Sequence, residues 1–76
     1  DLWIVGEVGL SGNVRSVNGI LSCVIAAKEN KAKAIIIPKE NENEASLISG
    51  IKIFPVSSIK DAVETINNLD NIKPLE

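Results

Sequence analysis

The sequence predicts a small α/β fold in which an antiparallel hairpin precedes a parallel βαβ unit, in the order ββαβαβα. Three observations support this prediction. A Ser11-Gly12-Asn13 turn separates two apolar segments, residues 35–37 form a β-branched run, and two later segments repeat apolar residues at helical spacing. At 76 residues the chain holds one core. We expect a single two-layer α+β unit over residues 1–69 and a polar tail over residues 70–76, whose last two residues resemble a cloning remnant.

The hairpin is predicted over residues 2–17. Gly12 tolerates the positive φ that short hairpin loops require, so the turn is a specific local signal. Gly6 and Gly9 weaken the first strand and indicate a bulge or a close backbone approach.

Two strands are predicted after the hairpin. The run Ile35-Ile36-Ile37 ends at Pro38 and shows no alternation, which is typical of a central parallel strand that is buried on both faces. The next strand covers residues 51–54 and is closed by Pro55. The segment between the two strands is long enough for the dozen or so residues that a parallel crossover needs.

The first two helices are predicted around these strands. Apolar residues recur at helical spacing over residues 20–30, and Asn18 is placed to cap that helix. A short helix is expected to follow Asn41, with Glu44 as the reciprocal partner of an Asn-type capping box and Gly50 as its left-handed stop.

The last helix is expected to begin at Ser58, which forms a capping pair with Asp61. Its apolar residues then trace one stripe, made of Ile59, Ala62, Val63, Ile66 and Leu69.

Composition excludes several classes of function. The chain contains no His, so it lacks the commonest neutral metal ligand and the side chain that titrates nearest physiological pH. A net charge of -2 argues against binding nucleic acid or a membrane surface by bulk charge.

The single Cys23 excludes an internal disulfide framework and favours a reducing, cytoplasmic compartment. No apolar run approaches the ~18 residues that cross a bilayer, and no signal-peptide pattern is present.

Two groups of residues invite a chemical interpretation. Cys23 is a possible nucleophile, but it lies within a helical apolar pattern without a His base, and a packed small hydrophobe is the favoured interpretation. Glu40, Glu42 and Glu44 have the alternation of a cation site, whereas their place at a helix start favours a solvated role that complements the helix dipole. We therefore assign no catalytic, cofactor or metal residue within this chain.

Charged residues suggest two further contacts. Glu7 is expected to pair with Arg15 across the hairpin or to face water. Lysines gather around one helix–strand connection, where they contact phosphate or simply solvate a loop beside a buried strand. The weak candidates for nucleic-acid contact are Arg15, Lys28, Lys31 and Lys33.

Three segments carry a family resemblance. The stretch from Gly6 to Gly19, GEVGLSGNVRSVNG, resembles the hairpin of Lon-type protease domains, RadA C-terminal domains and ComM-type proteins. Residues 26–41 resemble the alanine-ended helix and the I-I-P-x-E-N strand end of Lon and ComM. Residues 43–45 and 50–56 favour ComM, a magnesium-chelatase-like AAA+ ATPase family.

The resemblance implies the second half of a Lon-proteolytic-like domain, a fold shared with a ribosomal small-subunit protein. In Lon-type proteases a Ser nucleophile lies upstream, and its Lys partner lies on the helix after the hairpin. The corresponding positions here are Leu21 and Cys23, neither of which can act as an amine base. Lys28 is about one and a half turns further on, so the chain departs from the protease pattern at this position.

The leading hypothesis is a non-catalytic accessory piece of a ComM-like AAA+ ATPase involved in DNA processing and competence. It would serve packing, assembly or DNA contact. The resemblance implies a cytoplasmic parent that uses ATP and magnesium, assembles as a homo-oligomer and does not engage a membrane. Its partner would be the rest of the parent chain, including the AAA+ module. One alternative is a divergent Lon-type Ser–Lys protease fragment, and another is an interaction module whose hairpin completes another chain's sheet.

Overall fold

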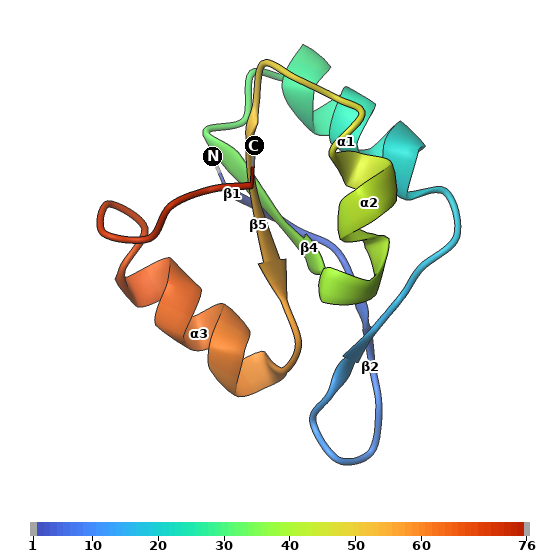
Figure 1. Cartoon of the computed structure of the whole chain (residues 1–76), viewed down its shortest axis with the longest axis vertical. Coiled ribbons are helices and arrows are strands. Elements are labelled where there is room, and N and C mark those ends of the chain that lie inside the picture. Colours follow the sequence, from blue (N-terminus) through green and yellow to red (C-terminus); the bar gives the residue numbers. More distant parts are fainter. Residues whose placement is uncertain (1, 76) are drawn as a thin grey trace.

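The computed structural model describes residues 2–75, so the outermost residues of the predicted unit and tail, Asp1 and Glu76, lie outside the described residues. Figure 1 shows the elements in chain order. They are β1 (Leu2–Ile4), β2 (Glu7–Val8), β3 (Val14–Arg15), α1 (Ile20–Glu29), β4 (Ala34–Pro38), the 3-10 helix η1 (Lys39–Asn41), α2 (Glu42–Ala45), β5 (Lys52–Val56) and α3 (Ile59–Asn67).

The main sheet has three strands in the order β1-β4-β5, and both pairings are parallel. β4 is central and all five of its residues are buried, as its unalternating apolar run predicts. The antiparallel pair β2–β3 forms a separate hairpin, and Gly12 in its turn has a φ of 83°. The predicted fold class, an antiparallel hairpin with a parallel βαβ unit, is therefore confirmed.

The first predicted strand is divided into two. Its beginning, β1, pairs with β4, where Val5 N–H still donates to Ile36 O at 2.9 Å. The chain then leaves this sheet at Gly6, where a Cβ would lie 2.9 Å from Val14 Cγ1. Gly6 thus permits the close approach that its place in the strand predicts, and the chain pairs with a new partner, β3, immediately afterwards.

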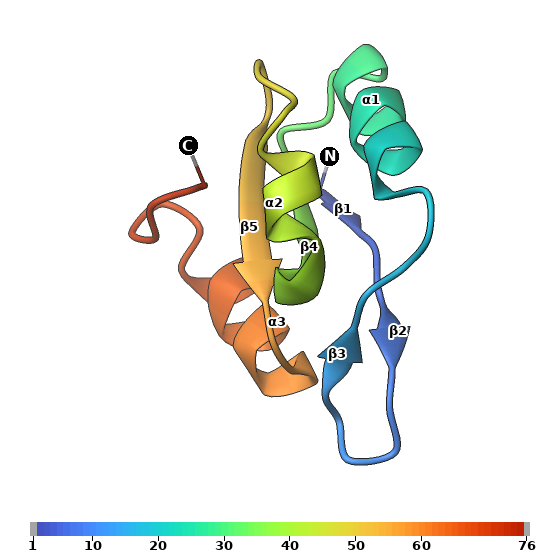
Figure 2. The ribbon, with the colours of Figure 1, turned by 45° about the vertical axis from the view of Figure 1, so that its right-hand side comes forward.

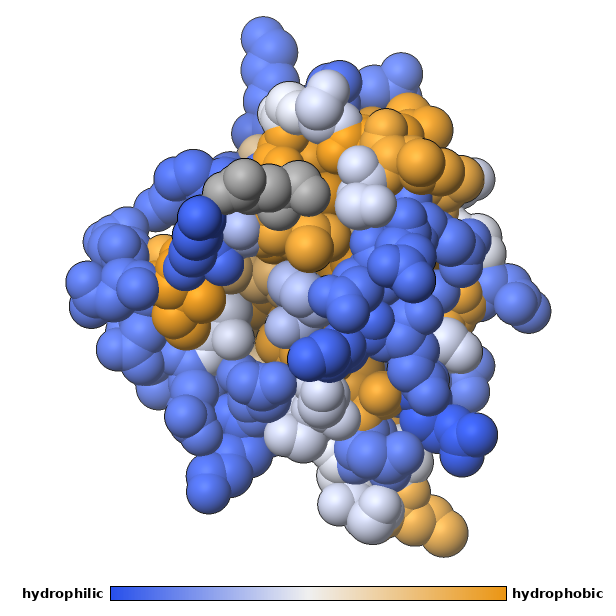
Figure 3. Space-filling model, in the orientation of Figure 1, coloured by the Kyte–Doolittle hydropathy of each residue, from blue (hydrophilic) through white to orange (hydrophobic). Residues whose placement is uncertain are grey.

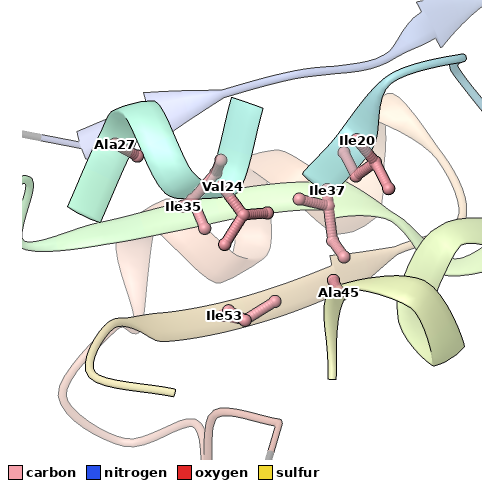
Figure 4. Packing of buried hydrophobic residues seen from close by; sticks show 7 residues of the cluster. All are labelled: Ile20, Val24, Ala27, Ile35, Ile37, Ala45 and Ile53. Carbon is pink, nitrogen blue, oxygen red and sulfur yellow. The ribbon is translucent and has the colours of Figure 1, made fainter. Parts of the chain in front are cut away.

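Helices cover both faces of the sheet. On one face, α1 and α2 pack over Ile35, Ile37 and Ile53, and Figure 4 shows these side chains meeting Val24 and Ala45. On the other face lie the side chains of Ala34, Ile36, Phe54 and Val56, against which α3 packs. The described residues therefore form three layers instead of the predicted two, because β4 and β5 are apolar on both faces.

The helix starts agree only in part with the predicted caps. α1 covers nearly the whole predicted range, but its N-cap is Gly19, with a φ of 75°, and not Asn18. Gly19 tolerates this left-handed turn, which a side chain would resist. At α3 the prediction is confirmed, since Asp61 N–H donates to Ser58 Oγ at 3.0 Å.

Two predicted strand and helix ends are wrong. β5 does not close before Pro55 but continues to Val56, because Pro55 lies on an edge strand and its missing N–H faces away from β4. Gly50 has the expected left-handed φ of 91°, yet α2 already ends at Ala45. Gly50 thus turns the chain into β5 and does not stop the helix.

Within the predicted polar tail, Leu75 returns to the sheet. Its N–H donates to Ile53 O at 2.7 Å, and its side chain packs against the cluster of buried residues on the α1 face. The outer edge of β5 is thereby partly covered by the end of the chain (Figure 1).

Candidate functional site

α1 is the helix that follows the hairpin, and the resemblance to Lon-type proteases implies an amine base on it. At the two positions concerned, α1 carries Leu21 and Cys23 instead of lysine. Leu21 and Cys23 are both half-buried, and Cys23 is a free thiol. Lys28 lies about 7.5 Å further along the helix axis than Cys23. Its side chain crosses the turn at Gly50, where a Cβ would lie 2.8 Å from Lys28 Cε. Lys28 therefore packs over the turn before β5.

Two of the three glutamates of the predicted cation cluster are bonded to different partners. Glu40 Oε1 accepts from Ser16 N–H at 2.8 Å, and Glu44 Oε1 accepts from the Asn41 side chain at 3.3 Å. Glu42 lies at the first position of α2. Across residues 2–75, no three His, Cys, Asp or Glu side chains come close enough together to hold a metal ion.

Asn41 is the buried polar residue that sequence reasoning misassigned. Its side chain does not cap α2 but contacts the chain before α1, where Oδ1 accepts from Val17 N–H at 2.9 Å. Nδ2 donates to Val17 O at 3.2 Å and to Glu44 Oε1. Asn41 is only 2% exposed. Together with Glu40, it ties the strand end after Pro38 to the segment that follows the hairpin.

The candidate nucleic-acid contacts fall into two separate places. Arg15 is exposed on β3, whereas Lys28, Lys31 and Lys33 are exposed around the end of α1 and the turn into β4. Figures 1 and 2 show these two segments at opposite ends of the molecule. The three lysines therefore form one group of exposed positive charges, and Arg15 lies apart from it.

The hairpin register places Glu7 and Arg15 on neighbouring strands, and their pairing stays a prediction. The two residues are directly opposite in the β2–β3 pair, and both are exposed. Opposite charges in this position stabilise a hairpin modestly.

An apolar groove is the feature that sequence reasoning did not foresee. It lies between α3 and the hairpin, on the face of the sheet that α3 only partly covers, and has a volume of about 290 Å³. Figure 2 shows α3 and the β2–β3 hairpin on either side of the lower end of the sheet. Every lining residue is Gly, Ala, Val or Ile, among them Ile4, Val8, Val14, Ile59, Val63 and Ile66.

The groove is lined by the predicted apolar stripe of α3. Ile59, Val63 and Ile66 are 46%, 49% and 39% exposed, so much of the stripe remains uncovered. Ala62 and Leu69 of the same stripe do pack on the sheet. The periodicity thus predicts the stripe correctly, but a periodic pattern does not reveal whether the chain itself supplies the covering residues.

A second hollow, of about 300 Å³, lies at the carboxyl ends of β4 and β5 and is partly polar. Asn13, Lys39, Glu40 and Ser57 line it. Glu40 is already bonded to Ser16 N–H, and Ser57 N–H donates to the Asp61 carboxylate at 3.0 Å. These polar groups therefore serve the fold.

None of the helices within residues 2–75 has the length and apolar character that crossing a bilayer requires.

Comparison with known proteins identifies a family and several relatives of this sequence. A protein-family model described as "Subunit ChlI of Mg-chelatase" matches residues 1–41. The chain is 34% identical over 68 residues to Competence protein ComM of Haemophilus influenzae, and 37% identical over 71 residues to Archaeal Lon protease of Methanocaldococcus jannaschii. It is 42% identical over 66 residues to DNA repair protein RadA of Aquifex aeolicus.

These matches cover 90%, 93% and 87% of the chain respectively, but only 13%, 11% and 14% of the three relatives. The module is thus a small part of proteins that are several times longer. The family model covers more than half of the chain, and it includes the hairpin and the strand end at Pro38 to Asn41. The chain therefore belongs to the Mg-chelatase ChlI family and is a fragment of the ComM- and Lon-like AAA+ type, as the resemblance of its hairpin and strand ends predicts.

Proposed function

We propose that this chain is a non-catalytic accessory part of a ComM-like AAA+ ATPase that processes DNA. In this proposal it contributes packing and assembly contacts, while ATP and magnesium bind elsewhere in a cytoplasmic, homo-oligomeric parent protein. The observation that supports the proposal is the surface of α1. Leu21 and Cys23 occupy the positions at which a protease of this type carries its amine base.

The concave surfaces support the same proposal. No polar side chain lines the apolar groove, whereas a binding pocket for a small substrate combines apolar walls with a few convergent polar groups. In the partly polar hollow, the Glu40 carboxylate and the Ser57 amide already have partners within the chain.

The similarity to Archaeal Lon protease favours one second candidate, a divergent Ser–Lys peptidase. Lys28 is the one lysine of α1 and would then have to supply the amine. Its position over Gly50, a turn and a half beyond the expected place, argues against this role.

Peptidase assays on the full-length protein separate the two candidates. We expect no peptide hydrolysis by the wild type. If hydrolysis is found, and Lys28→Ala abolishes it while the exposed control Lys60→Ala does not, the non-catalytic proposal is wrong. ATP hydrolysis by the 76-residue chain alone would contradict the proposal as well.

A contact with DNA is a separate part of the proposal and rests on the exposed lysines near the end of α1. Each lysine that neutralises a phosphate releases a counterion, so log K falls with log[salt] at a slope of about -0.9 per contact on duplex DNA. In the full-length protein, we expect the double variant Lys31→Glu, Lys33→Glu to bind DNA more weakly. Its plot of log K against log[salt] should be less steep, by up to about two in slope. Lys60→Glu on α3 is the control. An affinity and a slope equal to those of the control would rule out contact by these lysines.

A further inference from the structure

The two edges of the main sheet differ in a way that points to a missing strand. An open strand edge is a template for pairing, and natural edges are blunted by charge, by proline or by a covering segment. The β5 edge has all three, because Lys52 is exposed, Pro55 presents no N–H and Leu75 bonds to Ile53 O. The β1 edge, which consists of Leu2, Trp3 and Ile4, has no charge and no proline.

The backbone of β1 leaves donors and acceptors on its outer side. Val5 N–H donates to Ile36 O, so the N–H and C=O groups of alternate residues face β4. The corresponding groups of Leu2 and Ile4 then face the open edge. The Ile4 side chain is 58% exposed although it is aliphatic and lies in a sheet. Both the backbone and the side chain of β1 are thus available to a neighbour.

This edge is continuous with the apolar groove. Ile4 and the two residues after it line the groove, whose opposite wall is α3. A strand beside β1 would place alternate side chains against Ile4 and Val63, because successive residues of a strand point to opposite faces. The uncharged lining favours an apolar occupant over nucleic acid. On the face that Figure 3 shows, hydrophilic residues cover much of the surface and apolar areas lie between them.

We propose that the β1 edge and the apolar groove bind one extended, alternately apolar segment of the parent polypeptide, which becomes a fourth strand of the sheet. The relatives support an occupant from the same chain, since each contains this module as 11% to 14% of its length and thus has ample sequence beyond it. Main-chain hydrogen bonds to Leu2 and Ile4 hold the segment, and its apolar side chains fill the groove. The inference rests on the proposed function only in treating this chain as part of a longer AAA+ protein.

Amide hydrogen exchange tests the added strand directly. The Ile4 amide should exchange about a hundredfold or more slowly in the full-length protein than in the 76-residue chain. The Val5 amide is the internal control, because it is bonded to Ile36 O in either case. An Ile4 amide that exchanges equally fast in both proteins would overturn the proposal.

Two matched variants of the full-length protein sharpen the test. Ile4→Lys introduces a charge at the proposed junction, and it should return exchange near β1 to the rate of the 76-residue chain. Leu10→Lys makes the same change at the fully exposed hairpin tip, outside the groove, and should have no such effect. Equal effects of the two variants would refute the assignment.

The 76-residue chain also tests for a different occupant. If its Ile4 amide becomes protected as the protein concentration rises, a second copy occupies the edge and the assignment to the parent segment is wrong. Peptidase or ATPase activity in this chain would disprove the proposed function but would leave the exchange result standing, so the two failures are distinguishable.

Discussion

Replacement of Asn41 by Ala is the sharpest test of how this fold is held together. The Asn41 side chain makes two hydrogen bonds to the backbone of Val17 and one to Glu44, from a position that is 2% exposed. Alanine removes all three bonds. The N–H and C=O of Val17 are then left without these partners in a partly buried place.

The expected loss follows from those two backbone groups. A buried donor or acceptor without a partner costs about 1–3 kcal/mol. Because Val17 is only partly buried, we expect the free energy of unfolding to fall by about 2–4 kcal/mol. A chain of this length has a total stability of roughly 4–11 kcal/mol, so the variant would lose a large share of it.

Urea unfolding, followed by the fluorescence of the single Trp3, provides the measurement. Trp3 is half-buried against the cluster on the α1 face and therefore reports on the core. Asn43→Ala is the matched control, since Asn43 is exposed on the adjacent helix α2, where its backbone carbonyl, and not its side chain, accepts a bond from Ser46. Asn43→Ala should change the free energy of unfolding by less than about 0.5 kcal/mol.

A third variant separates the observed contact from the predicted cap. Serine is a good N-cap, but its side chain is too short to reach both backbone groups of Val17. If Asn41 acts through Val17, Asn41→Ser should be nearly as destabilised as Asn41→Ala. A serine variant of near wild-type stability, or an alanine variant no worse than Asn43→Ala, would refute the reasoning.

Two further predictions concern α3 and the groove. Ser58→Ala removes the acceptor of the Asp61 N–H and should lower the free energy of unfolding by about 1 kcal/mol, as thermal and urea unfolding would show, with no effect counting against the cap. Ile36→Ala, at a fully buried site, should cost about 2–5 kcal/mol. Val63→Ala in the 76-residue chain should lower the free energy of unfolding by less than about 1 kcal/mol, because Val63 is already half exposed. If Val63→Ala and Ile36→Ala lower it by similar amounts, the groove is covered and the reasoning is wrong.

Much of the fold is predictable because its signals are local. The apolar run of β4 requires burial on both faces wherever it is placed, so its central position follows from the residues themselves. The Ser58–Asp61 pair spans three positions and needs no partner from elsewhere. These features do not depend on which other elements the chain brings near.

The predictions that are wrong depend on distant partners. Asn41 has the local pattern of a cap, but the backbone of Val17 competes for its side chain and binds it instead. The break between β1 and β2 at Gly6 requires Ile36, which lies far along the chain, as well as Val14 on the other strand of the hairpin. Such contacts arise only when the tertiary structure forms, and a pattern within a few residues cannot specify them.

The candidate site follows the same division. The apolar stripe on α3 is visible as a helical period, but the groove also needs Ile4 and the hairpin to stand opposite it. The lysines around the end of α1 are close in sequence and stay close in space, whereas Arg15 lies elsewhere.

The parallel order of the sheet affects how readily β1 pairs with β4 during folding. β4 and β5 join through a crossover from Ala34 to Lys52, whereas β1 reaches β4 only after the longer loop from Leu2 to Ala34 closes. Loop-closure entropy makes the longer loop costlier by about 0.5 kcal/mol. When the whole chain refolds, we therefore expect β4 and β5 to pair slightly more readily than β1 and β4. The outer edge of β1 carries neither charge nor proline, so a partly folded chain presents it to other chains as a template for aggregation.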